Sequence, residues 1–545
     1  MKRLAALIVG ALASLVLLGA AAPPASAHAA LITTDPLDQS IVQRSPAKVT
    51  LVYGESVGVG LGALKVLTDQ GARVDTGQIT QSHGGSWVQL ALRPNLPSGT
   101  YVVVWRVISA DSHPVAGAFT FIVRKASRDP KTLLGRGNLR KLTATPAAPA
   151  LALGVTRFVG FSALVVLLGG AVFCLLLWPS GLPRLRPLLL AASVFELLAG
   201  IAALAIDGPY AAGLSLSQAF DTGLLRSVLK TTYGEATAAR VGLSLLAIVA
   251  VYFAARIRAG AGVLAALGTG WALTWSLAGH GGAGKWEPWT LIADLTHLVT
   301  ISAWAGGLIV MVWGLRRLWS EDERRAILPR WSTLATVAVV WLILSGTFAS
   351  IRQVGSWAAL TSTNYGIRLL IKVSLVGLML LLALIGRAFV RRHYPNGDPP
   401  SNKQLALVRR SVTTEASVAG LVLAVTALLV NTTPAAAEFA PPYTGISQAG
   451  PISVHVDIYP ARRGVNGLHI YTVGAKGLTV DVPFVSGYLT DTKGERITAY
   501  VQHKSLGHWE FLYLVLPHKG TWTIAVQVRV SDFDSYSTTQ SFKIR

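Results

Sequence analysis

Long apolar runs alternate with short polar loops through the middle of the chain. Eight of these runs are long enough to cross a bilayer, because about 20 apolar residues in a helix span its hydrocarbon core. They cover about residues 151–178, 187–206, 239–255, 261–279, 289–315, 332–351, 366–386 and 411–431. The pattern therefore predicts an all-α transmembrane bundle of eight helices within residues 151–432.

Both flanks of this region have a different pattern. Short stretches rich in Val, Ile, Thr and aromatic residues alternate with Gly, Pro, Asp and Asn in residues 28–125 and again in 451–545. About a hundred residues of such strands and turns predict a β-sandwich. Residues 126–150 and 433–450 lack periodicity and are predicted to be linkers. We therefore expect a multi-domain membrane protein, a helical bundle flanked by two all-β sandwiches of Ig-like or cupredoxin-like type.

The first 27 residues have the pattern of a secretory signal peptide. Two basic residues precede an apolar run, and Ala25-Ser26-Ala27 forms an A-x-A cleavage site. Cleavage there makes His28 the amino-terminal residue, whereas the alternative is an uncleaved membrane anchor. The preceding Pro23-Pro24 pair favours cleavage, because it breaks a helix where processing requires extended chain.

The distribution of charge predicts the orientation in the membrane. The chain is 52% hydrophobic and carries a net charge of +22. Its basic residues do not form a nucleic-acid-binding domain, since they lie largely in short loops between apolar runs. The positive-inside rule places the most basic loops, near residues 179–186, 256–260, 316–331 and 387–410, on the cytoplasmic side. Both sandwiches and both mature termini are therefore expected outside the cytoplasmic membrane.

Two common chemical signatures are excluded by the sequence. Gly279 to Lys285 spells G-x-x-x-x-G-K, but Trp286 stands where a phosphate loop needs Ser or Thr, and no strand precedes the motif. We therefore expect no nucleotide. The only cysteine, Cys174, lies in an apolar run, which leaves no disulfide framework, zinc cluster or redox pair within the chain.

One short motif and the new amino terminus predict a metal site in the first sandwich. Asp111 and His113 are two residues apart, so in an extended chain they face the same side. The amine and ring of His28 complete a set of nitrogen and carboxylate donors without sulfur. Such a set suits a tetragonal divalent ion, copper(II) foremost. The alternative is that Asp111 and His113 only cap a surface turn.

At these residues the chain resembles the CopC family of secreted copper-binding proteins, over almost all of residues 28–124. The resemblance rests on the mature amino-terminal His, the early Asp35-Pro36, the run GTYVVVWRVISADSHP from Gly99 to Pro114 and the closing G-x-F-T-F. It implies that His28 chelates copper(II) through its amine and ring and that Asp111 and His113 complete the site. Some members also hold copper(I) on methionines, but this sandwich contains none, so we expect copper(II) alone.

Ionisable residues at neighbouring ends of two apolar runs predict a second copper position. His280 closes the fourth run, and Asp294 and His297 lie three residues apart near the start of the fifth, on one face of a helix. Ionisable residues inside a membrane are rare and often mark ion pathways. We expect a copper relay of these three residues, with Glu415 as a candidate exit ligand or proton carrier. The alternative is an Asp-His hydrogen bond that only packs helices.

The membrane region resembles the CopD family, which accompanies CopC or is fused to it, from about residue 157 to 434. The resemblance rests on R-F-x-G-F in the first run, Gly279-His280, D-L-T-H-x-x-x-x-x-A-W-x-G-G-L in the fifth, N-Y-G-x-x-L-x-x-K in the seventh and R-R-S-V-x-x-E in the eighth. It implies copper uptake across the cytoplasmic membrane.

The last sandwich resembles, in pattern, the YtkA-like domains found behind CopD. It contains five histidines, His455, His469, His503, His508 and His518. They either form a weak copper site or are ordinary surface and strand residues.

The sequence thus predicts copper acquisition by a non-enzymatic protein whose partners are the copper ion and the bilayer. No ATP-binding motif is present, and an inside-negative potential favours cation entry by about 2.3 kcal/mol per charge per 100 mV. One alternative is copper resistance by sequestration outside, with the bundle as anchor or sensor. A second is a membrane electron-transfer enzyme that reduces copper, with haem held by paired histidines.

Overall fold

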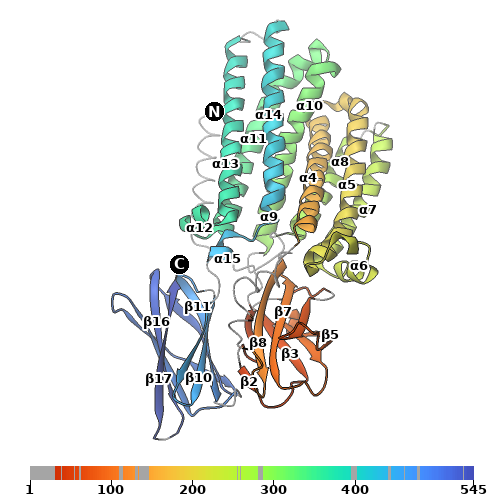
Figure 1. Ribbon diagram of the computed structural model, residues 1–545. Coiled ribbons are helices and arrows are strands. Elements are labelled where there is room, and N and C mark those ends of the chain that lie inside the picture. Colours follow the sequence, from red (N-terminus) through yellow and green to blue (C-terminus); the bar gives the residue numbers. More distant parts are fainter. Residues whose placement is uncertain are drawn as a thin grey trace.

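The computed structural model places two β-sandwiches side by side at one end of a long helical bundle (Figure 1). It describes residues 31–38, 40–53, 56–60, 63–109, 114–128, 133, 146–254, 256–257, 259–279, 287–393, 402–439, 443–459, 461–474, 479–531 and 533–544. The predicted signal peptide lies outside these residues. So do four of the predicted copper ligands, His28, Asp111, His113 and His280.

The amino-terminal sandwich consists of two four-stranded sheets, with the strand orders β1-β3-β6-β5 and β2-β8-β7-β4. Its strands are β1 (Leu31–Asp35), β2 (Ser40–Val42), β3 (Lys48–Tyr53), β4 (Leu64–Thr68), β5 (Asp75–Ser82), β6 (Trp87–Leu92), β7 (Gly99–Ile108) and β8 (Pro114–Val123). In β6, Val88, Leu90 and Leu92 are buried and the residues between them are partly exposed, because successive side chains of a strand point to opposite faces. The two sheets enclose one apolar core, which confirms the predicted sandwich.

Helices occupy the middle of the chain. They are α4 (Ala147–Leu176), α5 (Leu182–Ala212), α6 (Thr222–Val228), α7 (Thr232–Ala254), α8 (Gly260–Leu277), α9 (Glu287–Ile301), α10 (Gly307–Trp313), α11 (Glu321–Val354), α12 (Trp357–Ser362), α13 (Asn364–His393), α14 (Asn402–Leu429) and α15 (Ala435–Phe439). Among the described residues, seven helical segments are long and apolar enough to cross a membrane. The predicted span outside this set is the fourth, α8, which has only 18 residues and four glycines but packs against α4 and α7. The chain is a multi-domain membrane protein, as its apolar pattern predicted.

The fifth predicted span is not a regular α-helix throughout. A π-helical turn at Ser302–Gly306 joins α9 to α10. Gly169 of α4 approaches this turn so closely that a Cβ atom on it would lie 2.1 Å from the carbonyl oxygen of Ser302. Glycine at positions 169 and 306 therefore lets the two backbones meet, and the wider turn places one extra residue at the contact.

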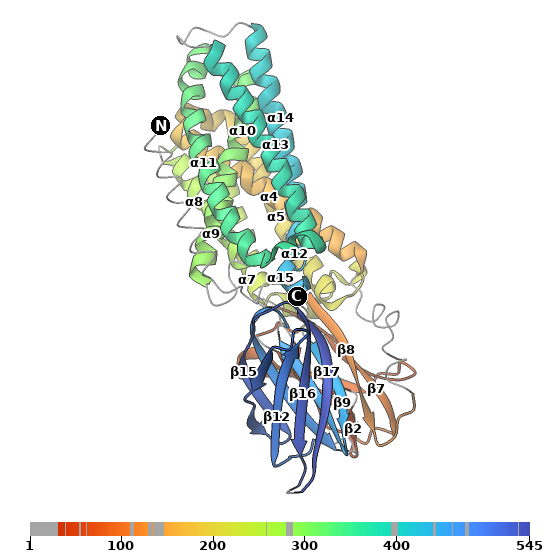
Figure 2. The ribbon, with the colours of Figure 1, turned by 90° about the vertical axis from the view of Figure 1, so that its left-hand side faces the viewer.

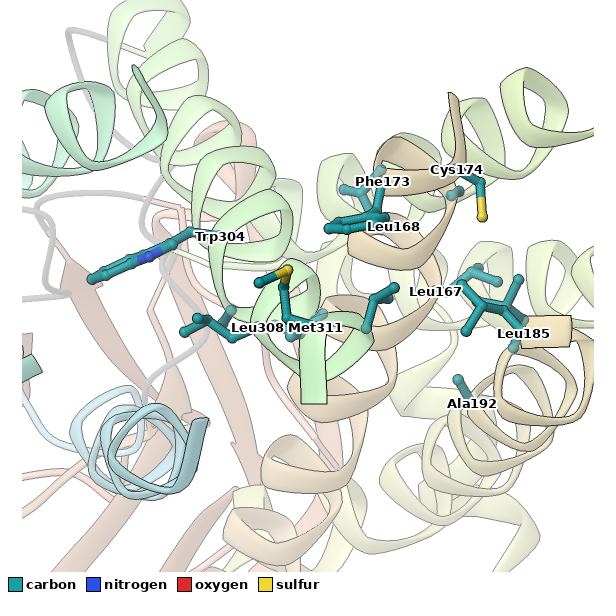
Figure 3. Packing of buried hydrophobic residues seen from close by; sticks show 14 of the residues in the cluster. Leu167, Leu168, Phe173, Cys174, Leu185, Ala192, Trp304, Leu308 and Met311 are labelled. Atoms are coloured by element: carbon teal, nitrogen blue, oxygen red, sulfur yellow. The ribbon is translucent and has the colours of Figure 1, made fainter. Parts of the chain in front are cut away.

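Apolar side chains of α4 form the centre of the bundle (Figure 3). Leu167, Leu168 and Phe173 are at most 1% exposed. They pack in one cluster with Leu185 of α5 and Met311 of α10. In a lipid environment such contacts stabilise the bundle mainly through close packing, because lipid tails are as apolar as the side chains they replace.

The carboxyl-terminal region is a second all-β unit, with sheets in the orders β14-β15-β11-β10-β9 and β13-β12-β16-β17. Its strands are β9 (Tyr443–Ala449), β10 (Ile452–Tyr459), β11 (Gly464–Gly474), β12 (Phe484–Asp491), β13 (Arg496–Ala499), β14 (Gln502–Ser505), β15 (His508–Leu516), β16 (Gly520–Arg529) and β17 (Ser535–Ile544). Trp509 and Trp522 fill the core between the two sheets. We call this unit the C-terminal sandwich.

The two sandwiches contact the bundle and each other (Figures 1 and 2). Strand β7 packs against α5, where the buried Arg106 lies over Gly213. A Cβ atom at Gly213 would come within 2.5 Å of the Arg106 guanidinium, so glycine is required for this approach. Strand β1 contacts β10 of the C-terminal sandwich, and Asp38 interacts electrostatically with Asp457 there. The sequence pattern gave no information on this docking.

Candidate functional site

A cavity of about 480 Å³ lies inside the helical bundle. Its lining includes residues from the ends of several helices that lead toward the sandwiches: Gly279 after α8, Gln353 near the end of α11, Tyr365 at the start of α13 and Val430 after α14. The cavity is therefore in the half of the bundle nearest the sandwiches, where α9 begins (Figure 2).

Asp294 and His297 both line this cavity from α9. Their three-residue spacing places them on one helical face, as the sequence predicted. The Nδ1 atom of His297 lies 3.1 Å from Oγ of Ser345 on α11. Gly346 leaves space for the ring, since a Cβ atom there would lie 3.1 Å from Cε1 of His297.

The contacts of Ser345 indicate which nitrogen of His297 can bind a metal. The Ser345 hydroxyl donates to the carbonyl oxygen of Trp341, 2.7 Å away. In the arrangement in which the hydroxyl gives its single proton to that carbonyl, its oxygen accepts from His297 and the imidazole proton lies on Nδ1. Nε2 then carries the lone pair, and a hydrogen bond at one ring nitrogen is the usual way to orient the other toward a metal.

A lysine and a tyrosine share the cavity with Asp294. Lys372 of α13 interacts electrostatically with Asp294 and with His297. Tyr365 also interacts with Asp294, and its hydroxyl donates to the side-chain oxygen of Gln353. Neither Lys372 nor Tyr365 was predicted to lie beside Asp294. A signal was present, because Tyr365, Leu369 and Lys372 follow one another at helical spacing within the N-Y-G-x-x-L-x-x-K motif and all three line the cavity.

A second group of polar side chains borders the cavity. Arg240 of α7 lies 3.7 Å from Glu196 of α5, and its Nε donates to Thr274 of α8 at 2.9 Å. The guanidinium also lies over the Trp275 ring, 3.6 Å from its centroid. Trp275 lines the cavity, as does Arg157, which donates to the Asn431 side chain. These contacts pair buried charges within the bundle, which favours structural roles for them.

Glu415 lies apart from the residues of α14 that line the cavity. Its Oε1 accepts a hydrogen bond from Ser411 one turn earlier, at 3.1 Å, and the side chain is buried. The first α14 residue in the cavity lining is Val422, about two turns further along the helix. The structure therefore brings Asp294 and His297 together but does not bring Glu415 to them.

The residues that flank the predicted copper motif of the first sandwich face the bundle. Ile108 pairs with Pro114, so residues 109–113 connect the neighbouring strands β7 and β8. Ile108 also pairs with Gly58, and a Cβ atom at Gly58 would lie 3.8 Å from the side chain of Thr231, between α6 and α7. The connection that carries Asp111 and His113 thus begins and ends at the bundle side of the sandwich.

The fold and the cavity define a membrane protein with β-sandwiches at one end of a helical bundle that encloses a polar-lined cavity. Residues 31–124 match the CopC domain, residues 147–287 match the copper resistance protein D-like N-terminal domain and residues 325–429 match copper resistance protein D. The chain belongs to the CopC and CopD family of copper transport and resistance proteins, and its long apolar helices make it a multi-pass membrane protein.

Individual proteins and a solved structure are similar to this chain. It is 26% identical to "Copper transport protein CutJ" of Bacillus subtilis (strain 168) over 538 residues, which cover 93% of this chain and 94% of CutJ. It is 32% identical to "Copper resistance protein C" of Pseudomonas syringae pv. tomato over 106 residues, 18% of this chain and 83% of that protein. The crystal structure of CopC from Methylosinus trichosporium OB3b covers 19% of this chain and 98% of its own, with 28% identity and a TM-score of 0.16.

Proposed function

We propose that this protein imports copper. The first sandwich captures copper(II) outside the cell, and the bundle carries copper across the cytoplasmic membrane. The observation that carries the proposal is the cavity at the sandwich end of the bundle, lined by Asp294 and His297. A carboxylate and an imidazole nitrogen with an available lone pair are ligands suited to copper(II). The similarity of the chain to the copper transport protein CutJ, over almost the whole length of both, agrees with this activity.

In this proposal His28, Asp111 and His113 hold the captured ion, and it moves a short way to the bundle. Support comes from Ile108 and Pro114, which flank the motif and lie at the end of the sandwich that packs near Thr231. His280 follows directly on Gly279, which lines the cavity. The proposed relay is therefore His280, then Asp294 and His297, with Glu415 serving the later part of the path.

Lys372 has a specific part in this proposal. Its ammonium group interacts electrostatically with Asp294 in the cavity. A copper cation that binds Asp294 replaces Lys372 as its counter-ion, and Lys372 must then move away because like charges repel at short distance in a low-dielectric site. Lys372 thereby limits cation entry to ions that bind Asp294 and His297 strongly enough to displace it.

The direction of transport follows from the membrane potential. With the sandwiches outside, as the signal peptide and the basic loops favour, a divalent cation moving inward gains about 4.6 kcal/mol per 100 mV. Import therefore needs no nucleotide. Copper resistance by external sequestration is the second candidate function, because several relatives are named copper resistance proteins. In that case the bundle serves as an anchor or sensor.

Copper accumulation in cells tests the proposal. Cells that carry the wild-type chain should accumulate copper faster than cells that carry a His280→Ala/His297→Ala variant. His518→Gln changes an exposed histidine of the C-terminal sandwich and serves as the matched control, which should transport as the wild type does. Equal accumulation in wild type and the double variant, at equal amounts in the membrane, contradicts import through this cavity.

A visible spectrum of the purified protein separates transport from the third candidate, a membrane electron-transfer enzyme. Haem bound by His280 and His297 would give a Soret band that His297→Ala abolishes. We expect no such band. Its presence would support the enzyme, whatever the result of the accumulation experiment.

A further inference from the structure

Three side chains with nitrogen and oxygen donors meet on the outer face of the five-stranded sheet. His469 of β11 pairs directly with Glu510 of β15, and His508 lies two residues before Glu510 on the same strand. Leu468 and Ile470, on either side of His469, are buried in the core of the C-terminal sandwich. Side chains alternate along a strand, so His469 points to the opposite face of the sheet. Glu510, which pairs with His469, and His508 lie on that same outer face.

The distances within this group are those of metal ligands. Nδ1 of His469 and Nε2 of His508 form a hydrogen bond of 3.0 Å, which a metal ion that binds both nitrogens would replace. One donor atom from each of His469, His508 and Glu510 lies within 4.8 Å of the other two. Two nitrogens bound to one ion at about 2.0 Å, with an angle of about 90 to 110°, are about 2.8 to 3.3 Å apart. The imidazole pair thus already has the spacing of two ligands of one ion.

Neighbouring residues orient the group. The Tyr471 ring stacks on His508, with centroids 4.5 Å apart and an interplanar angle of 14°. This packing restrains the ring that carries the Nε2 donor. Lys504 forms an ion pair with Glu510, at 2.8 Å between Nζ and Oε1, from a largely exposed position. A bound metal would compete with Lys504 for this carboxylate, and because the Lys504 side chain is 60% exposed, water can solvate it once it is displaced.

The chemistry of the donors selects the kind of ion. The C-terminal sandwich has no cysteine and no methionine, so it offers none of the soft ligands that copper(I) prefers. Two imidazoles and a carboxylate suit a divalent first-row metal, for which copper(II) has the highest intrinsic affinity. We propose that His469, His508 and Glu510 form a copper(II) site in the C-terminal sandwich, separate from the one around His28.

This site adds a second extracytoplasmic copper position to the chain. It lies on the same sheet face as Asp457, which pairs with His469 and interacts electrostatically with Asp38 of the first sandwich. The site therefore lies one strand away from the contact between the two sandwiches. Neither its residues nor its geometry depend on transport through the bundle, so it is independent of the proposed import.

Copper(II) titration of the purified full chain in detergent, followed by electron paramagnetic resonance, tests the site. A His113→Ala background removes the contribution of the first sandwich. In this background His508→Gln should weaken binding at least tenfold and abolish the spectrum of the site, because one of its two imidazoles is lost. His518→Gln is the matched control and should leave the affinity and the spectrum unchanged.

A second variant separates a metal site from a structural cluster. Lys504→Gln removes the competitor of the metal at Glu510 and should tighten copper(II) binding roughly two- to fivefold, the range that a surface ion pair supports. A merely structural role would not produce this gain. The proposal would be overturned if His113→Ala and His113→Ala/His508→Gln bound copper(II) with the same affinity. It would also be overturned if His508→Gln and His518→Gln weakened copper(II) binding equally. Should His508→Gln fail to fold, His469→Gln removes the other imidazole and is judged by the same outcomes.

Discussion

Nε of Arg240 lies 3.7 Å from Oε1 of Glu196, and the two side chains are at most 2% exposed within the helical bundle. Each charge is the partner of the other across α5 and α7. Arg240 has further contacts with Thr274 and with the face of Trp275, so it links α7 to α8 at the edge of the cavity. We infer that this pair fixes the wall of the cavity and does not itself bind copper.

This inference predicts an asymmetry between single and double substitutions. Glu196→Gln leaves the buried Arg240 charge without its partner and should destabilise the bundle by about 3 to 5 kcal/mol. Glu196→Gln/Arg240→Met removes both charges and should cost much less. Thermal or denaturant unfolding of the wild type, Glu196→Gln, Arg240→Met and the double variant in detergent measures the difference. A double variant as unstable as the sum of the two single variants would show that the pairing is unimportant.

Asp75 of the first sandwich predicts a dependence of stability on pH. Its side chain accepts hydrogen bonds from the backbone N–H groups of Val66 and Gly77 and pairs with Arg73 at 2.8 Å. Burial alone would raise the pKa of Asp75, but the Arg73 side chain and these amides outweigh burial and lower it. Because the pKa is lower in the folded state, Asp75 stabilises the sandwich above the unfolded pKa of about 4. This stabilisation is lost as the pH falls through the lower, folded value.

Asp75→Asn therefore should destabilise the first sandwich at pH 7 by about 1 to 3 kcal/mol, since two amides lose a charged acceptor. The difference from wild type should shrink below about pH 4, where the wild-type carboxylate also takes up a proton. Unfolding of the full chain at a series of pH values, followed by circular dichroism, measures both effects. A difference that stays constant from pH 7 to pH 3 would contradict this assignment.

The regular part of the fold could be predicted because it follows from periodicity. Buried and exposed residues alternate in strands such as β6 because one face meets the core and the other meets water. Helices such as α4 are apolar over a long run because they lie in lipid. Both patterns are local in the sequence. The helical placement of Asp294 and His297 was predictable for the same reason, since it depends only on their spacing within one helix. The family was predictable from motifs at matching places in the chain.

Features that depend on contact between distant segments could not be predicted in this way. The π-helical turn beside Gly169 arises where two backbones meet, and Gly306 in the fifth apolar run permits this contact without indicating which helix it meets. Lys372 lies beside Asp294 although 78 positions separate them in the chain, because α13 and α9 face one cavity. The cluster of His469 with His508 requires the register of β11 against β15, which a list of scattered histidines does not contain.

The copper(II) site predicted in the first sandwich has a sharp test at its amino terminus. One extra residue before His28 separates the amine from the ring that the predicted chelate needs, so high-affinity binding should be lost. His113→Ala should weaken binding far more than His83→Ala, which is the matched control. His83 stacks on Trp87, with centroids 4.3 Å apart, in a turn distant in sequence from the D-x-H motif. Equal losses for the two alanine variants in a copper(II) titration would refute the assignment.

The relay in the membrane makes a prediction about Asp294. Asp294→Asn keeps the size of the side chain and much of its hydrogen bonding but removes the negative charge that offsets an incoming cation. Copper uptake should fall sharply, while the protein still inserts and the first sandwich still binds copper(II). If Asp294 only packs helices, the amide can still accept a hydrogen bond, and the change should cost about 1 to 2 kcal/mol of stability without loss of uptake.

Lys372 allows the two roles of Asp294 to be separated. In Asp294→Asn the Lys372 charge loses its electrostatic partner, so part of any loss of function could come from instability alone. Asp294→Asn/Lys372→Gln removes both charges and should recover the melting temperature. If the carboxylate binds the passing copper ion, uptake should stay low in this double variant even though its stability is restored. Recovery of uptake together with stability would show that Asp294 serves only to balance Lys372, and unchanged uptake in the single variant would falsify the relay outright.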